Sequence, residues 1–252
     1  MTMTITILLF LIAHIIADFY LQSTRLANDK QKYIGALVQH IIIYSIVMLI
    51  FSAFFSNLTY LMLGLGLAVV HALIDYCKFL YSRNRQLTKA NHIQLFMFDQ
   101  ALHVLTIIGL ITIFYHSSTL ESAWFNNVVS FIDTTYLFSA NVALQWILAV
   151  LLSIKPASIV VKMSLGYFEP KELQKDNPGI IQAGEFIGIL ERVIILVLLA
   201  TGSYAAIGFV LTAKSIARYN KIAEEPKFAE YYLIGTLVST LFVLIIYQLI
   251  FY

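Results

Sequence analysis

Apolar runs of about 20 residues recur along this chain of 252 residues, and they restrict its fold more than any other feature. A helix of roughly that length crosses the hydrocarbon core of a bilayer, which is about 30 Å thick. The composition agrees, because only 12% of the residues are charged, whereas a soluble domain has about 25%. Since backbone groups in lipid must bond within their own segment, the sequence predicts an all-α, polytopic transmembrane helix bundle.

The apolar runs and the basic residues together predict a topology. The expected spans, about eight, cover residues 3–22, 34–55, 59–81, 94–115, 135–154, 180–201, 203–218 and 231–251. The seventh is short and its boundary at Gly202 is weak, so seven spans is an alternative. Loops 55–59, 115–134 and 201–203 contain no lysine or arginine, whereas the alternate loops do. The positive-inside rule then places both termini outside, in a multi-pass protein of the cytoplasmic membrane, here a bacterial inner membrane.

Three parts are expected along the chain. Residues 1–116 form an N-terminal four-helix half, residues 117–179 an outer loop, a fifth span and a cytoplasmic connector, and residues 180–252 the C-terminal helices. The four prolines fall in predicted loops, so no span is expected to be broken by proline. They are Pro156, Pro170, Pro178 and Pro226.

Charge and cysteine content exclude several classes of function. The net charge of +2 comes from basic residues dispersed through short loops, so no nucleic-acid partner is expected. The single cysteine, Cys77, excludes an internal disulfide and a cysteine-rich metal site. The first apolar run lacks the basic start of a signal peptide and continues into His14 and Asp18, which indicates a retained first helix.

Histidine and aspartate recur on the first four predicted spans. In the first span, steps of four residues place His14, Asp18 and Gln22 on one helical stripe. The third and fourth spans repeat the pair, and the second adds one histidine. These residues are His71, Asp75 and Lys78, then Asp99, Gln100 and His103, and finally His40.

The order of the residues within each pair follows the direction of its helix. Histidine precedes aspartate in the inward first and third spans, and follows it in the outward fourth span. At about 1.5 Å per residue, the aspartates lie roughly 6–9 Å and the histidines roughly 9–15 Å below the cytoplasmic boundary. An unpaired aspartate near a helix centre costs about 2.5–3.5 kcal/mol on insertion scales. The pattern therefore predicts one buried polar site in the cytoplasmic leaflet.

Imidazole and carboxylate are ligands of divalent metals, with zinc or manganese the expected ion. The remaining aspartates would act as general bases. The alternative is a histidine–aspartate hydrogen-bond network that only locks the packing of the helices. The expected metal ligands are His14, Asp18, His40, His71, Asp75, Asp99 and His103, with Asp18, Asp75 and Asp99 as the catalytic candidates.

Further polar groups are candidates for contacting a substrate or a phosphate. Gln22 and Gln100 either hold substrate or make ordinary interhelical hydrogen bonds, and Lys78 either contacts a phosphate or reaches to the interface. In the C-terminal half, the cations form either a clamp for a phosphate or lipid headgroup, or simple anchors of the helix ends. The residues concerned there are Glu191, Arg192, Lys214 and Arg218.

These motifs as a set resemble bacterial membrane proteins of the domain-of-unknown-function 3307 family. The resemblance rests on His-x3-Asp-Phe-x-Leu-Gln at residues 14–22, His-x3-Asp-x2-Lys at 71–78 and Asp-Gln-x2-His at 99–103. It covers residues 10–115 well and extends through the Gly-x3-Gly-x2-Glu-Arg run at 184–192. The family name implies no activity, so no catalytic role follows from it.

The leading hypothesis is a membrane-embedded metal-dependent hydrolase acting at the cytoplasmic leaflet on a lipid or phosphorylated amphiphile. A transporter or channel for protons or divalent cations is the first rival, because histidine and aspartate relays line such paths. A non-enzymatic sensor or accessory protein is the second. The expected partners are membrane lipid and such a substrate, and an oligomer is compatible with the sequence.

Overall fold

The computed structural model describes residues 3–83, 85, 88–117, 122–136, 138–168 and 183–252. Eleven α-helices and one π-helix make up these residues, so the prediction of an all-α fold is confirmed. The chain divides into two compact units, residues 1–148 and 149–252. Part of the predicted connector, residues 169–179, lies outside the described residues and includes Pro170 and Pro178.

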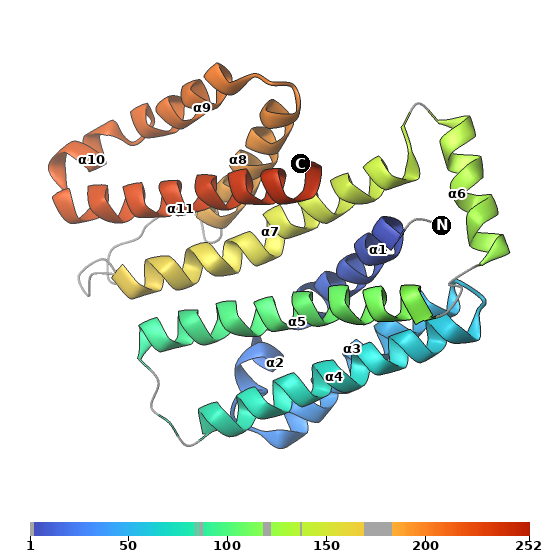
Figure 1. The fold of residues 1–252 in the computed structure, drawn as a ribbon. Coiled ribbons are helices and arrows are strands. Elements are labelled where there is room, and N and C mark those ends of the chain that lie inside the picture. Colours follow the sequence, from blue (N-terminus) through green and yellow to red (C-terminus); the bar gives the residue numbers. More distant parts are fainter. Residues whose placement is uncertain (1–2, 84, 86–87, 118–121, 137, 169–182) are drawn as a thin grey trace. The chain divides into compact units, whose positions relative to one another are not determined.

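Unit 1 is built on helices that pack side by side in a group (Figure 1). Helix α1, Met3–Ile15, continues directly into the π-helix η1, Ile16–Tyr20. It packs against α3, Ile34–Ala53, and α5, Lys89–Ser117. Helix α4, Leu58–Arg83, lies between α3 and α5 and contacts both. Two shorter helices complete the unit, α2 at Thr24–Asp29 and α6 at Ala123–Thr135.

Unit 2 contains the second part of α7, Ala140–Phe168, and the remaining helices. Helix α8, Ala183–Ala200, packs on α11, Pro226–Phe251. Helix α9, Tyr204–Ile216, follows α8 after a turn in which Gly202 adopts a φ of 68°, and the short α10, Tyr219–Glu224, contacts α11. Pro226 stands in the first turn of α11, where its missing N–H costs no helical bond.

Six helical segments are long and apolar enough to cross a membrane, which makes this a multi-pass membrane protein by length and composition. They are Met3–Tyr20, Ile34–Ala53, Leu58–Arg83, Lys89–His116, Ala140–Phe168 and Pro226–Phe251. The sixth and seventh predicted spans correspond to α8 and α9. Helix α8 has three charged residues, Glu185, Glu191 and Arg192, and α9 has only 13 residues. Eight spans and outward termini therefore stay predictions.

The expectation about Pro156 was wrong. The fifth helix does not end at residue 154 but continues through Pro156 to Phe168. Proline in a helix interior removes one backbone donor and crowds the preceding turn. In a membrane helix such a site is tolerated where neighbouring groups supply the lost bonds, and a donor from another helix reaches this turn, as described below.

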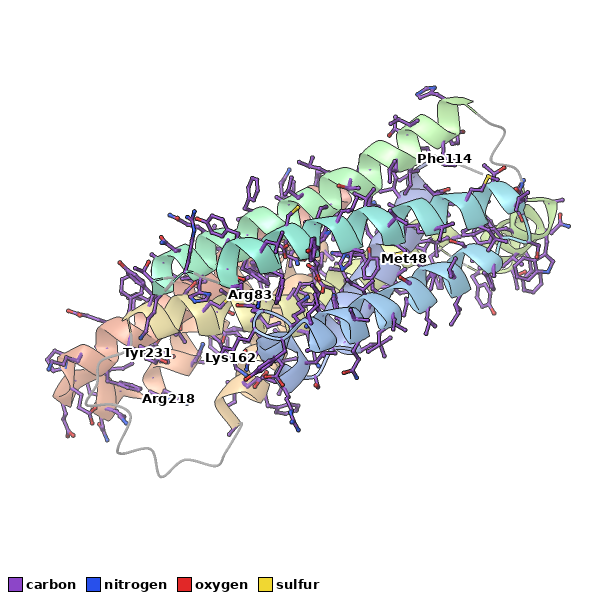
Figure 2. The ribbon with its side chains drawn as sticks, turned by 90° about the horizontal axis from the view of Figure 1, so that it is seen from below. Met48, Arg83, Phe114, Lys162, Arg218 and Tyr231 are labelled. Atoms are coloured by element: carbon purple, nitrogen blue, oxygen red, sulfur yellow. The ribbon has the colours of Figure 1, made fainter. Side chains whose placement is uncertain are left out.

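One half of the helix group in unit 1 is filled with apolar side chains. The largest fully buried ones include Phe10, Tyr60, Leu63 and Ile111. Phe55 stacks on Tyr60 with ring centroids 4.0 Å apart. This apolar cluster occupies the end of the group near Phe114, whereas Arg83 marks the opposite end (Figure 2).

Candidate metal centre and cation cluster

Four side chains from three helical segments of unit 1 meet at one buried point. Nε2 of His40 lies 3.3 Å from Oδ1 of Asp18 and 3.2 Å from Oδ2 of Asp75. The Nε2 atoms of His40 and His71 are 3.2 Å apart, and Nε2 of His71 lies 3.7 Å from Oδ2 of Asp75. A tetrahedral ion with bonds of about 2.0–2.1 Å holds its ligand atoms about 3.3 Å apart. The four atoms are thus spaced as ligands of a single divalent ion.

Local backbone geometry directs Asp18 into this group. Asp18 lies in η1, where the N–H of Leu21 bonds to the carbonyl of Ile16 at 2.9 Å across a π turn. Such turns insert one residue into a helix and are frequent at functional sites. The wider turn changes the direction of Asp18 relative to His14, so the two side chains meet different partners although they lie four residues apart.

A second group adjoins the first through Asp75. Nε2 of His103 lies 3.6 Å from Oδ1 of Asp75 and 3.6 Å from Oδ1 of Asp99. Among the described residues, none of these three atoms has a hydrogen-bond partner, and the three side chains are at most 3% exposed. His71, Asp75 and His103 also offer ligand atoms within 4.8 Å of one another. The two oxygens of Asp75 therefore face different groups.

Lys30 covers the first group, a role that the sequence analysis missed. Its Nζ lies 3.3 Å from Oδ1 of Asp18 and 3.2 Å from Oδ2 of Asp75, the same oxygens that face His40. Burial acts to lower the pKa of the Lys30 ammonium, but the carboxylates of Asp18 and Asp75 outweigh it and raise that pKa above its usual range. Lys30 therefore stays charged at neutral pH.

Tyr44 of α3 is the second missed member. Its ring stacks on His71 with centroids 3.4 Å apart and an angle of 8° between the planes, and its hydroxyl lies 3.2 Å from Nδ1 of His14. Nδ1 of His71 has no hydrogen-bond partner among the described residues. The stack with Tyr44 thus orients that imidazole where no hydrogen bond does. His14 lies beside the cluster, with its ring 5.4 Å from that of His103.

The polar residues predicted beside the cluster are its nearest neighbours. Nε2 of Gln100 donates to Oδ2 of Asp18 at 2.9 Å, and Lys78 pairs with Oδ2 of Asp99 at 2.6 Å. Gln22 instead bonds to the main chain, because its amide nitrogen donates to the carbonyl oxygen of Asp18 at 2.7 Å in the orientation that satisfies both amide atoms. Lys78 thus offsets Asp99 rather than Asp75.

An open groove of about 680 Å³ runs between α4 and α5 and reaches the cluster. Its walls are mostly apolar, and Lys78 and Asp99 stand among them. The lining residues are Leu73, Ile74, Cys77, Lys78, Tyr81, Asn91, Gln94, Leu95, Phe98, Asp99 and Leu102.

Unit 2 buries a different kind of charge, the guanidinium of Arg192. This side chain is 2% exposed, and its Nε donates to the carbonyl of Ser153 at 2.5 Å. Its Nη2 donates to the hydroxyl of Ser158 at 2.6 Å and to the carbonyl of Ile154 at 3.4 Å, and its Nη1 to the hydroxyl of Ser239 at 3.3 Å. These donors reach the turn of α7 that Pro156 disturbs, and all four acceptors are neutral.

The other cations of unit 2 have varied partners. Lys214 lies 2.5 Å from Oε2 of Glu191, so each of these two residues has the partner that its place in a membrane helix requires. Lys162 pairs with Glu185 at 2.6 Å. Arg218 is exposed and lies over the ring of Tyr232, 5.9 Å from its centroid.

The comparisons with known proteins support the resemblance and add no activity. The family model described as protein of unknown function (DUF3307) matches residues 6–132, which contain every residue of the histidine–aspartate cluster. Neither the comparison with curated proteins nor that with solved structures found a match. The matched segment makes up half of the chain, so this protein belongs to the DUF3307 family.

Proposed function

We propose that unit 1 is a membrane-embedded metal-dependent hydrolase whose centre lies in the cytoplasmic leaflet of the cytoplasmic membrane. The observation that carries the proposal is the spacing of four buried ligand atoms, from Asp18, His40, His71 and Asp75, at 3.2–3.7 Å where their separations are known. Mixed imidazole and carboxylate ligands suit zinc and manganese.

Hydrogen bonds alone account poorly for the first group. Nε2 of His40 has three polar neighbours within 3.3 Å, belonging to Asp18, Asp75 and His71. An imidazole nitrogen carries at most one proton, so it serves one of these acceptors well and leaves the others with a poor contact. A cation at the common centre of the four atoms satisfies all of them together.

The neighbouring residues divide the remaining work. A divalent ion supplies Lewis acidity and activates a water for attack. Asp99 is the aspartate outside the first group, and its free Oδ1 faces His103 while Lys78 holds its other oxygen. Asp99 with His103 is therefore the proposed proton-transfer pair.

The groove between α4 and α5 favours an amphiphilic substrate. Its walls are apolar, and its polar members Lys78 and Asp99 belong to the proposed reaction site. An acyl chain would lie along Leu73 and Phe98, while the polar end of the molecule contacts Lys78. A lipid or phosphorylated amphiphile has this division of character.

The apolar cluster in the other half of unit 1 argues against transport. A path for protons or divalent cations needs polar groups or water on both sides of the site. The side chains beyond the histidines are instead apolar and closely packed, including Phe10, Leu63, Leu67 and Ile111. The site is thus open to one side of the bundle, as a hydrolase requires.

Elemental analysis of the detergent-purified protein tests the metal centre. We expect about one zinc or manganese ion per chain, and a loss of that ion on His40→Ala or His71→Ala. His92→Ala and His116→Ala are matched controls, because both residues are exposed and lie outside the cluster. Protein without stoichiometric metal before any variant is made would refute the proposal. Two ions per chain would assign His103 and Asp99 to a second ion.

Turnover of 4-nitrophenyl octanoate and of bis(4-nitrophenyl) phosphate separates metal binding from hydrolysis. We expect His103→Ala to keep the metal and to lower turnover by about 10²–10⁴-fold, the usual contribution of general acid–base catalysis. A stoichiometric ion with no turnover of either probe would leave the metal centre standing and remove the hydrolase.

A further inference from the structure

Unit 2 contains a pocket of about 260 Å³ whose polar lining is dominated by cations. Lys162, Arg192, Lys214 and Arg218 contribute to its walls, from α7, from α8 and from the end of α9. The apolar side chains of Val161, Leu165 and Ile187 line the same space. Such a pocket combines a polar binding region with room for hydrocarbon.

The charges around this pocket do not balance within the described part of the chain. The four cations face two carboxylates, Glu185 and Glu191, which pair with Lys162 and Lys214. Arg192 and Arg218 remain, and each has only neutral partners in the described residues. A buried charge without a counter-charge is costly in a membrane and marks a binding site.

Two details direct this excess charge toward the pocket. Gly188 lines the pocket next to Arg192, and a Cβ atom at this position would stand 3.3 Å from Nη1 of the guanidinium. The absence of a side chain therefore leaves room beside the charge. The hydroxyl of Tyr232, a lining residue, is buried and has no hydrogen-bond partner among the described residues.

We propose that this pocket binds a phosphate group, and that the phosphate belongs to an amphiphile. A guanidinium presents donors in a fork that matches phosphate oxygens, and an ammonium adds a point charge. The hydroxyl of Tyr232 supplies a further donor, and the apolar walls take the start of an acyl chain. Free phosphate shares the headgroup chemistry without the chain.

This proposal does not depend on the metal centre, because every residue of the pocket belongs to unit 2 and every proposed metal ligand to unit 1. Failure of one leaves the other standing. Metal content is therefore expected to be unchanged in the variants of the pocket.

The test measures binding of three probes to the full-length protein in detergent. They are dioctanoyl phosphatidic acid, dioctanoylglycerol and inorganic phosphate, followed by native mass spectrometry and by the shift in thermal midpoint. We expect phosphatidic acid to bind, dioctanoylglycerol to bind at background level, and Arg218→Gln or Lys162→Gln to weaken phosphatidic acid by about tenfold each. Both residues are exposed at the rim, so neither variant should impair folding. Lys227→Gln is the control, since Lys227 is exposed and is not a lining residue.

The outcomes separate the sources of phosphate. Inorganic phosphate that binds as tightly as phosphatidic acid, with the same dependence on Arg218, would assign the site to a free anion and overturn the amphiphile. Phosphatidic acid that binds no better than dioctanoylglycerol, or equally well to wild type and to both rim variants, would overturn the phosphate site.

Discussion

The two units of this protein both bury ionisable side chains, but they leave opposite charges over. In unit 1, three aspartates of the cluster face two lysines, Lys30 and Lys78, so with neutral imidazoles one negative charge is in excess. In unit 2, four cations around one pocket face two carboxylates, so two positive charges are in excess. The first unit is arranged for a cation and the second for an anion.

The acceptors and donors around each charge differ in the same way. In unit 1, the buried atoms without partners include Oδ1 of Asp75, Oδ1 of Asp99 and Nε2 of His103, all able to bind a metal. In unit 2, the buried guanidinium of Arg192 is bonded to neutral carbonyls and hydroxyls. Neutral bonds stabilise a charged donor without cancelling its charge, which stays available to an anion. Each prediction below tests one side of this comparison.

The largest effect is expected from Asp75→Asn. Both oxygens of Asp75 face imidazoles, Oδ2 toward His40 and Oδ1 toward His103. An amide is a weaker ligand and removes one negative charge, so the cluster should lose its attraction for a divalent ion. We expect bound metal to fall to background by elemental analysis, whereas Asp29→Asn, outside the cluster, keeps the wild-type content. Full metal content in Asp75→Asn would reduce the cluster to a packing network.

The sequence was sufficient to predict the helices and the polar stripes, because both depend on local patterns. Apolar runs of the right length gave six helices that could cross a membrane. Steps of four residues placed His71 and Asp75 on one face of α4, and both are buried in the cluster. Periodicity within one helix is readable without knowledge of its neighbours.

Lys30, Tyr44 and Pro156 could not be assigned in this way. Lys30 meets Asp75 across 45 residues of sequence, and its place after a short helix in a loop resembles that of any basic residue near a membrane. An apolar span that contains Tyr44 gives no sign of a stack on His71. Pro156 is tolerated inside α7 because Arg192, far along the chain, donates to the adjacent carbonyls. These features arise from tertiary contacts.

Ser158→Ala tests the neutral bonds of unit 2. The hydroxyl of Ser158 accepts from Nη2 of Arg192 at 2.6 Å, and its loss leaves a buried charged donor with a poorer partner. We expect a destabilisation of about 2 kcal/mol, the usual value for a hydrogen bond to a charged group, measured by the thermal midpoint in detergent. Ser153→Ala is the matched control, since Arg192 binds its carbonyl and its own buried hydroxyl has no partner in the described residues. Equal losses in the two variants would contradict the account.

Lys30→Met tests the excess charge of unit 1. The ammonium of Lys30 touches the same carboxylate oxygens, on Asp18 and Asp75, that would bind the ion, so it opposes a divalent cation. Its removal should raise metal affinity by about tenfold, or about 1.4 kcal/mol, in a chelator competition assay. Lys32→Met, at an exposed position, should leave the affinity unchanged. If Lys30 only neutralises a carboxylate network, the variant will be destabilised and will gain no affinity for metal.

Tyr44 should give the smallest effect, and it distinguishes how the two units orient their polar groups. Tyr44→Phe removes the contact with Nδ1 of His14 but keeps the stack on His71, so we expect a loss of about 1 kcal/mol in stability and unchanged metal content. Tyr44→Leu also removes the stack, and because Nδ1 of His71 has no partner in the described residues, nothing else fixes that ring. Metal affinity should then fall by about tenfold, the lower end of what groups that orient a ligand contribute. Equal metal affinity in both variants would show that packing on all sides, rather than the tyrosine, orients His71.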